Sequence, residues 1–219
     1  MKDIILFDLD GTLTDPKEGI TKCAQYALAH FGIKVDDLQE LMPFIGPPLI
    51  ESFQEFYGLS YEQAEEAVLK YRERFKDIGI FENGVYEGVK ELLSICKTAG
   101  KTVCLATSKP EIYARRILER YELSQYFDEA VGSTMDGSIN TKAEVIREAF
   151  RRLNIESEAD KAKTIMIGDR KHDILGAKAC GIQSVGVHFG YAEPGELEEA
   201  GADYMVDTIE ELKDLCIRL

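Results

Sequence analysis

The sequence predicts an α/β protein: a doubly wound parallel sheet with an inserted α-helical domain. Three observations support this prediction. Five short apolar runs have the length of buried strands, and segments with helical periodicity alternate with the later runs. Such alternation is typical of a parallel sheet with helices on both faces. One interval, from about residue 17 to residue 82, contains helical stretches but no strand-like run.

The predicted strands are the apolar runs at residues 4–8, 102–106, 130–132, 164–167 and 184–187. The predicted helices of the core lie at residues 85–99, 111–121, 141–153, 173–180 and 210–218. Local signals mark several helix ends. Gly100 follows the first helix, and Pro110 precedes the second. Thr141 and Glu144 form a capping box at the start of the third.

The interval without strands predicts a helical insertion directly after the first strand. Helices are expected near residues 20–31, 48–57 and 61–78, with a loop rich in proline and glycine among them. We therefore expect a core of residues 1–16 and 83–219 and a helical domain of residues 17–82. A chain of 219 residues suits one domain that carries such an insertion.

Composition argues against several classes of function. With 26 basic and 40 acidic residues, the net charge of −14 argues against binding to nucleic acid or to anionic membrane surfaces. No apolar run approaches the roughly 20 residues that span a bilayer. The five cysteines are scattered without a CxxC pair, so a disulfide framework or a zinc site is not expected. Because the chain opens on a strand without a basic leader, we expect a cytoplasmic protein.

Two carboxylates follow the first strand. Asp8 and Asp10 are two residues apart and lead into Gly11 and Thr12. In open α/β sheets, ligands bind at the carboxyl edge of the strands, where these acids lie. Two acids so close repel each other unless a cation or a shared proton relieves them. The simplest interpretation is a Mg²⁺ site with one carboxylate free to act as a nucleophile.

Other strand ends supply further polar side chains. Thr107, Ser108 and Lys109 follow the second strand. Asp169 and Asp173 follow the fourth strand, and Lys142 stands at the start of the helix after the third. Because the carboxyl ends of parallel strands converge on one edge, we expect carboxylates, a hydroxyl and an ammonium to meet in one cleft.

Four motifs in this order resemble those of the haloacid dehalogenase superfamily of phosphotransferases. They are DLDGT at residues 8–12, the strand-end Thr107 and Ser108, Lys142, and GDRKHD at residues 168–173. Within the superfamily, the motifs look most like the phosphoglycolate phosphatase and 5′-nucleotidase group. The resemblance implies a Rossmann-like core with a helical cap and a Mg²⁺-dependent phosphatase. It also implies an aspartyl-phosphate intermediate, with a nucleoside 5′-monophosphate or 2-phosphoglycolate as substrate.

The resemblance also implies roles for individual residues. Asp8 is the nucleophile and Asp10 the general acid and base. Lys142, Thr107 and Ser108 bind and stabilise the phosphoryl group. The metal ligands are Asp8, the backbone carbonyl of Asp10, Asp169 and, through water, Asp173, which alternatively only orients Lys142. Residues that could set substrate specificity are Lys17, Glu18, Gly46, Lys109 and Arg170.

Plainer interpretations stay open for several of these residues. Thr107 can be part of a helix cap, Gly46 part of an interhelical turn, Asp173 an N-terminal acid of its helix, and Arg170 a salt-bridge residue. A phosphomutase of the β-phosphoglucomutase kind is an alternative function. A non-enzymatic receiver module that accepts phosphate on an aspartate is a further one, although its usual length is shorter. The sequence allows a monomer or a homodimer.

Overall fold

The computed structural model describes residues 2–219, so residue 1 of the predicted core range lies outside the described residues. The chain divides into two compact units. The larger one comprises the residues up to Thr14 together with Val85–Leu219, and the smaller one comprises Asp15–Gly84. The sequence placed these boundaries two residues away, at 16/17 and 82/83. The chain passes between the units through β2 (Thr14–Asp15) and β3 (Gly84–Val85), which pair with each other.

The larger unit contains a six-stranded sheet in the order β5-β4-β1-β6-β7-β8, with every neighbouring pair parallel. This arrangement confirms the predicted doubly wound core. The strands are β1 (Ile4–Phe7), β4 (Thr102–Pro110), β5 (Glu129–Ser133), β6 (Thr164–Gly168), β7 (Gln183–Val187) and β8 (Tyr204–Val206). Phe7 pairs in register with Leu105 and Ile167 on its two neighbours. The carboxyl ends of these strands therefore point to the same edge of the sheet.

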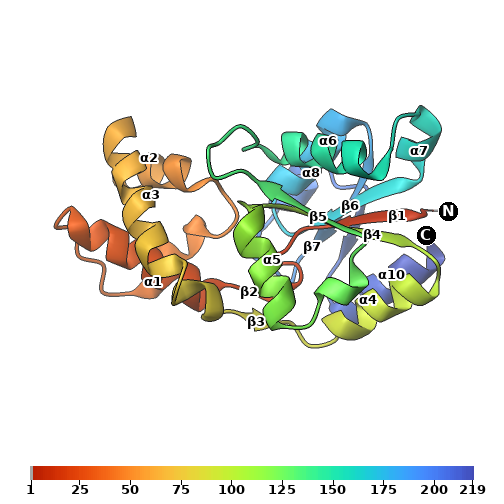
Figure 1. The fold of residues 1–219 in the computed structure, drawn as a ribbon, viewed down its shortest axis with the longest axis horizontal. Coiled ribbons are helices and arrows are strands. Elements are labelled where there is room, and N and C mark those ends of the chain that lie inside the picture. The colour runs from red at the N-terminus through yellow and green to blue at the C-terminus, as the bar shows by residue number, and fades with distance from the viewer. Residues whose placement is uncertain (1) are drawn as a thin grey trace. The chain divides into compact units, whose positions relative to one another are not determined.

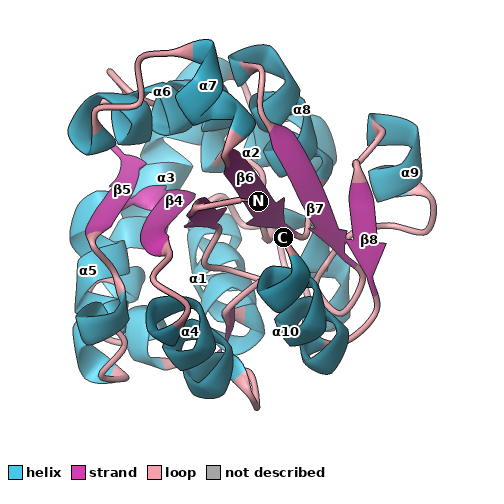
Figure 2. Cartoon of the chain, turned by 90° about the vertical axis from the view of Figure 1, so that its right-hand side faces the viewer, coloured by secondary structure: helices cyan, strands magenta, loops and turns pink. Residues whose placement is uncertain are grey.

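Helices cover both faces of this sheet (Figures 1 and 2). One face carries α6 (Lys142–Leu153), α7 (Glu158–Ala162) and α8 (Lys171–Cys180). The opposite face carries α4 (Val89–Thr98), α5 (Glu111–Arg120) and α10 (Ile209–Arg218), while α9 (Glu196–Ala200) contacts α8. A short 3₁₀ helix spans Ser124–Tyr126. None of the helices within residues 2–219 has the length and apolar character needed to cross a bilayer.

The core explains why these segments fold as they do. Leu6 and Met166 from the central strands pack against Val145 and Ile146 of α6, and all four side chains are fully buried. The predicted capping box is present: Thr141 Oγ1 accepts the Glu144 N–H at 3.3 Å, and the Glu144 carboxylate accepts the Thr141 N–H at 2.9 Å. This cap begins α6 at Lys142 and so places that lysine in the first turn.

One helix prediction needs correction. The segment expected as a helix over 85–99 begins only at Val89, because its first residues belong to β3 and to a turn. Gly88 has a φ of 86°, in the left-handed region that favours glycine, and precedes the first helical residue. The helix expected over 173–180 begins two residues earlier, at Lys171.

The smaller unit is helical, as predicted for the insertion. It contains α1 (Lys17–His30), α2 (Leu49–Tyr57), α3 (Tyr61–Phe75) and 3₁₀ helices at Leu38–Phe44 and Gly79–Phe81. Phe44 and Phe53 meet edge to face in its core, with ring centroids 4.9 Å apart. A side chain at Gly19 would place its Cβ 2.1 Å from the Gly79 carbonyl oxygen, so the two backbones approach as only glycine allows.

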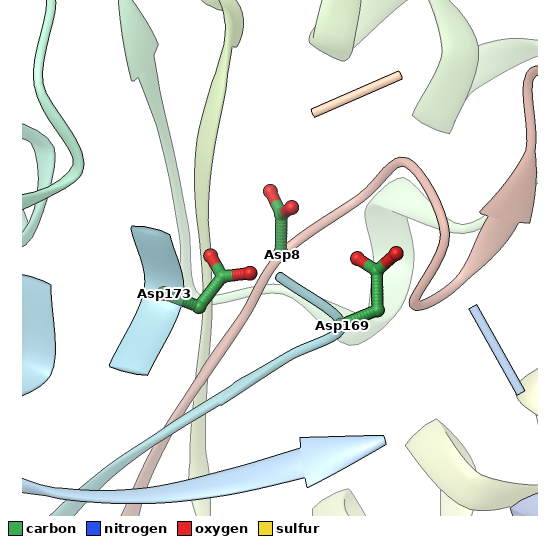
Figure 3. A group of neighbouring side chains, drawn as sticks. All are labelled: Asp8, Asp169 and Asp173. Carbon is green, nitrogen blue, oxygen red and sulfur yellow. The ribbon is translucent and has the colours of Figure 1, made fainter. Parts of the chain in front are cut away.

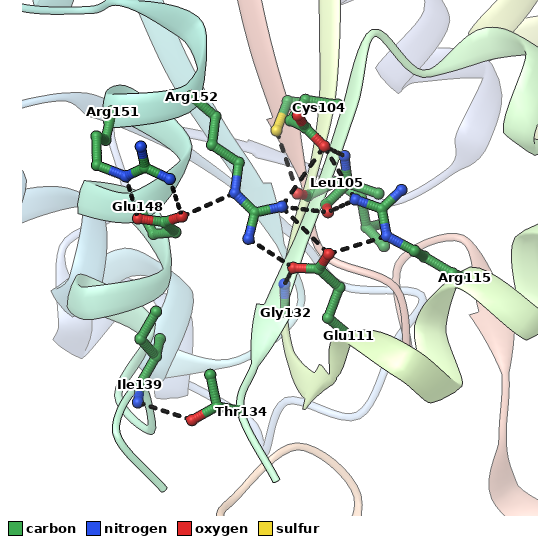
Figure 4. A network of polar contacts seen from close by, with 12 residues as sticks. Cys104, Leu105, Glu111, Arg115, Gly132, Thr134, Ile139, Glu148, Arg151 and Arg152 are labelled. Carbon is green, nitrogen blue, oxygen red and sulfur yellow. Dashed lines mark hydrogen bonds and ion pairs between the residues drawn. The ribbon is translucent and has the colours of Figure 1, made fainter. Parts of the chain in front are cut away.

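Two arginines protect the edge strand β5 (Figure 4). The Ala130 carbonyl accepts hydrogen bonds from Arg115 Nη2 at 2.7 Å and from Arg152 Nη1 at 3.3 Å. Arg152 Nη2 also donates to Glu111 Oε2 at 2.9 Å. Charged side chains on an exposed edge make it a poor template for pairing with another chain. This network therefore ties α5 and α6 to the edge and covers part of it.

The same network lowers the pKa of two carboxyl groups. Hydrogen bonds from Arg151 and Arg152 lower the pKa of Glu148 from 4.5 to about 2. Burial acts to raise the pKa of Glu111, but the hydrogen bonds from Arg152 and Arg115 outweigh it and the pKa is lowered. Both groups therefore stabilise the fold above the pKa of the unfolded chain. This contribution is lost as the pH falls from about 4.5 towards 2.

Arg152→Met is expected to weaken this acid dependence. At pH 7 the free energy of unfolding should fall by about 1 kcal/mol, because the pairs are partly exposed and screened. On acidification from pH 5 to pH 3 the variant should lose less stability than the wild type, since its carboxyl pKa values are lowered less. Urea denaturation at both pH values measures this. Arg218→Met is the control, because Arg218 bonds a backbone carbonyl of its own helix; equal acid dependence in wild type and Arg152→Met would contradict the prediction.

Candidate active site

Three carboxylates converge at the carboxyl edge of the large sheet (Figure 3). Asp8 follows β1, Asp169 follows β6, and Asp173 lies in the first turn of α8. One oxygen from each lies within 4.8 Å of the others, and all three residues are buried. The structure thus brings together three acids that the sequence predicted as metal ligands, although Asp8 and Asp169 are far apart along the chain.

Lys142 lies against two of these acids. Its Nζ atom is 2.9 Å from Asp8 Oδ1 and 2.8 Å from Asp173 Oδ1, and it donates a hydrogen bond to the Ala106 carbonyl at 2.9 Å. Burial alone would lower the pKa of Lys142, but the charges of Asp173 and Asp8 outweigh it and raise the pKa. The side chain is therefore held as an ammonium. Gly176 on α8 leaves room for it, since a Cβ there would lie 2.8 Å from Lys142 Cγ.

Asp169 is fixed at both oxygens. Thr12 Oγ1 donates to Oδ1 at 3.2 Å, and the Tyr191 backbone N–H donates to Oδ2 at 2.8 Å. Burial raises the pKa of Asp169 well above its ordinary value, and the charges of Asp173 and Asp8 raise it further. Burial likewise raises the pKa of Asp173, to about 6. The cluster therefore carries more negative charge than this buried site accommodates easily.

The donor atoms fit a hard divalent cation. The Oδ1 atoms of Asp8, Asp10 and Asp173 are buried and accept no hydrogen bond from residues 2–219, although Lys142 forms ion pairs with two of them. Carboxylate oxygens are the ligands that cations such as Mg²⁺ prefer. A divalent cation at this cluster would offset its surplus negative charge.

Asp10 has a partner of its own. Lys109 Nζ lies 2.5 Å from Asp10 Oδ2, and both side chains are nearly buried. Burial raises the pKa of Asp10, and the opposing charge of Lys109 is not sufficient to cancel this effect. Lys109, predicted from the sequence as a specificity residue, is thus paired in the structure with the expected general acid.

The remaining predicted residues fall into three groups. Thr107 is buried and its Oγ1 accepts the Lys109 N–H at 3.2 Å, while Ser108 is half-buried. Both residues lie in β4, which continues past the strand end predicted at residue 106. Arg170 pairs with Glu196 at 2.9 Å, in agreement with its plainer interpretation as a salt-bridge residue. The third group belongs to the smaller unit, and its role in specificity stays a prediction: Lys17, Glu18 and Gly46.

Sequence reasoning missed the loop that follows β7. Tyr191 contributes a backbone N–H to Asp169, and Gly190 lies directly against that carboxylate. Every residue except proline has a backbone N–H, so the residue type does not reveal which one donates to a functional group. The available signal was positional, because residues 188–191 follow a predicted strand at the same edge as the acidic cluster.

The fold and the site define an α/β protein with a helical insertion after the first strand of its parallel sheet. A buried carboxylate–lysine centre lies at the carboxyl edge of that sheet, where open α/β sheets bind their ligands. Residues 5–187 match the family of haloacid dehalogenase-like hydrolases, and the chain belongs to that family.

Named relatives agree with this assignment. The chain is 46% identical over 193 residues to a 5′-nucleotidase of Pseudomonas aeruginosa, covering 88% of this chain and 86% of that protein. It is 31% identical over 215 residues to a phosphoglycolate phosphatase of Cupriavidus necator, covering 96% and 91%. The crystal structure of a predicted phosphatase from Clostridium acetobutylicum superposes with a TM-score of 0.95 at 46% identity, covering 100% of both chains. The protein is therefore an enzyme of the phosphatase class.

Proposed function

We propose that the protein is a Mg²⁺-dependent phosphatase that hydrolyses small phosphate monoesters through a covalent aspartyl-phosphate on Asp8. The observation that best supports this proposal is the buried cluster of Asp8, Asp169 and Asp173, whose ligand oxygens lie within 4.8 Å of one another. The Lys142 ammonium lies 2.9 Å from Asp8, the acid that follows the central strand. Such a cluster places a carboxylate nucleophile beside a positive charge that can neutralise the phosphoryl oxygens.

The proposed cation ligands are Asp8, Asp169 and the Asp10 carbonyl, with Asp173 contributing through water. Mg²⁺ at this position supplies charge neutralisation for the phosphoryl oxygens, which a carboxylate nucleophile needs in order to approach phosphorus. Lys142 adds a fixed positive charge beside Asp8, and Thr107 and Ser108 donate hydrogen bonds to the phosphoryl oxygens. Lys142 donates to the Ala106 carbonyl and Thr107 Oγ1 accepts the Lys109 N–H, so the fold holds both side chains before substrate arrives and they need little reorganisation.

The proposed reaction consists of two successive displacements at phosphorus, in which Asp8 and Asp10 take part. In the first, Asp8 forms a bond to phosphorus while the bond from phosphorus to the leaving oxygen breaks, and Asp10 gives its proton to that oxygen. In the second, Asp10 takes a proton from a water molecule, whose oxygen attacks the phosphorus and releases Asp8 and inorganic phosphate. The raised pKa of Asp10, caused by burial, suits the first of these roles.

The proposed substrates are nucleoside 5′-monophosphates or 2-phosphoglycolate. The names of the Pseudomonas aeruginosa and Cupriavidus necator relatives support both. The net charge of −14 supports a small metabolite rather than a nucleic-acid polymer as partner. A cytoplasmic location is supported by the five cysteines, which are all buried and form no disulfide within the described residues 2–219.

A panel of phosphate esters tests the proposal. It contains AMP, UMP, 2-phosphoglycolate, p-nitrophenyl phosphate and β-glucose 1-phosphate, each with Mg²⁺ and with EDTA. We expect phosphate release from at least one ester, a loss of at least about 100-fold with EDTA, and recovery when Mg²⁺ is returned. Failure to release phosphate from any ester would overturn the proposal. Conversion of β-glucose 1-phosphate to the 6-phosphate without net hydrolysis would instead identify a phosphomutase.

A further inference from the structure

The loop after β7 lies directly against Asp169. The Tyr191 N–H donates to Asp169 Oδ2 at 2.8 Å. Gly190 approaches so closely that a Cβ on it would lie 2.3 Å from Asp169 Cβ and 2.5 Å from the Gly11 carbonyl oxygen. Gly190 is not among the glycines with a positive φ, so space rather than backbone conformation requires glycine here.

Contacts on both sides hold this loop in place. The His188 N–H donates to the Val206 carbonyl of β8 at 3.0 Å. The Phe189 ring meets the Tyr86 ring edge to face, with centroids 5.8 Å apart and an interplanar angle of 76°. The 188–191 loop is thus held by a hydrogen bond to the edge strand β8 and by the contact between the Phe189 and Tyr86 rings. These contacts fix Gly190 and Tyr191 relative to Asp169.

Residues that follow β1 also contact the Asp169 carboxylate. Thr12 Oγ1 donates to its Oδ1 at 3.2 Å. A Cβ on Gly11 would lie 2.0 Å from its Oδ2, so the Gly11 backbone also touches the carboxylate. The side chain therefore contacts two glycine backbones and accepts one hydrogen bond on each oxygen. This arrangement leaves it little rotational freedom.

We infer that the 188–191 loop is a positioning element for the metal centre. Gly190 and the Tyr191 N–H hold Asp169 in the orientation in which it shares a cation with Asp8 and Asp173. The inference rests on the proposed Mg²⁺ site and extends it to residues that do not touch the cation. Groups that orient a metal ligand set metal affinity, and their loss weakens binding by about 10- to 100-fold.

Calorimetric titration with Mg²⁺ tests the inference without reference to turnover. Gly190→Ala should bind Mg²⁺ about 10- to 100-fold more weakly than the wild type, because the added methyl group displaces Asp169. Asp169→Asn gives the affinity of a centre that lacks this ligand. The matched control is Gly186→Ala, which adds the same methyl group within β7, where it meets Leu197 instead of Asp169. Gly186→Ala should keep the wild-type Mg²⁺ affinity.

The outcomes separate the inference from the proposed function. Wild-type Mg²⁺ affinity in Gly190→Ala would overturn the inference, and equal weakening in Gly186→Ala would do the same by showing a general loss of packing. A wild-type protein that binds no Mg²⁺ would overturn the proposed function instead. If Gly190→Ala does not fold in EDTA, Tyr191→Pro is used in its place, because proline lacks the N–H that donates to Asp169. The Mg²⁺ affinity of Tyr191→Pro should fall by a similar factor.

Discussion

Asp8→Asn is expected to lower kcat by roughly 10⁴- to 10⁶-fold, because an amide cannot serve as the nucleophile. The fold should not suffer. Lys142 keeps its ion pair with Asp173 at 2.8 Å, and the substitution removes one negative charge from a buried group of three acids. We expect the free energy of unfolding in EDTA to equal or exceed that of the wild type, since like charges in a buried site repel.

Three measurements check this prediction. Phosphate release gives kcat, and urea denaturation in EDTA gives stability. Rapid acid quenching with a labelled ester should trap label on the wild-type protein and none on Asp8→Asn. Asp3→Asn is a suitable control, because Asp3 pairs with Lys163 at the surface, 3.8 Å away, and should change neither quantity appreciably. Turnover close to the wild-type rate in Asp8→Asn would show that another group attacks phosphorus.

The sheet was predictable because buried parallel strands are continuous apolar runs. The segments that the sequence did not predict lack such a signal. β8 (Tyr204–Val206) is a three-residue edge strand with only one buried side chain. The helices α7 and α9 have five residues each, too few to establish helical periodicity. β4 extends to Pro110 through polar residues that resemble a loop.

The candidate site was predictable for a different reason. Topology alone brings the ends of parallel strands to one edge, so Asp8 and Asp169 can be placed without knowing any side-chain conformation. The residue with which each side chain pairs depends on tertiary packing. Lys109 stands at a strand end like a substrate contact, but its ammonium lies 2.5 Å from Asp10. Arg170 turns to Glu196 at 2.9 Å. Pairings between residues so far apart along the chain leave no periodic pattern in the sequence.

Lys142→Met is expected to have the largest effect on stability. In EDTA the free energy of unfolding should fall by about 3–5 kcal/mol, because the substitution removes the ammonium from a buried group of ion pairs and leaves the acids uncompensated. Mg²⁺ should restore more stability to this variant than to the wild type, because the cation then supplies the missing positive charge. Turnover should fall by roughly 10²- to 10³-fold even with Mg²⁺ present, through the loss of charge stabilisation at the phosphoryl group.

The origin of this destabilisation can be isolated with a double-mutant cycle. Asp8→Asn reduces the surplus negative charge and Lys142→Met increases it, so the double variant should be more stable in EDTA than Lys142→Met alone. Lys90→Met is the control for loss of a lysine, because Lys90 and its partner Glu122 are both exposed and its removal should change stability little. Unfolding with and without Mg²⁺ is measured for the four proteins of the cycle and for the control. If Asp8→Asn failed to rescue Lys142→Met, packing of the lysine stem rather than its charge would hold the cluster together.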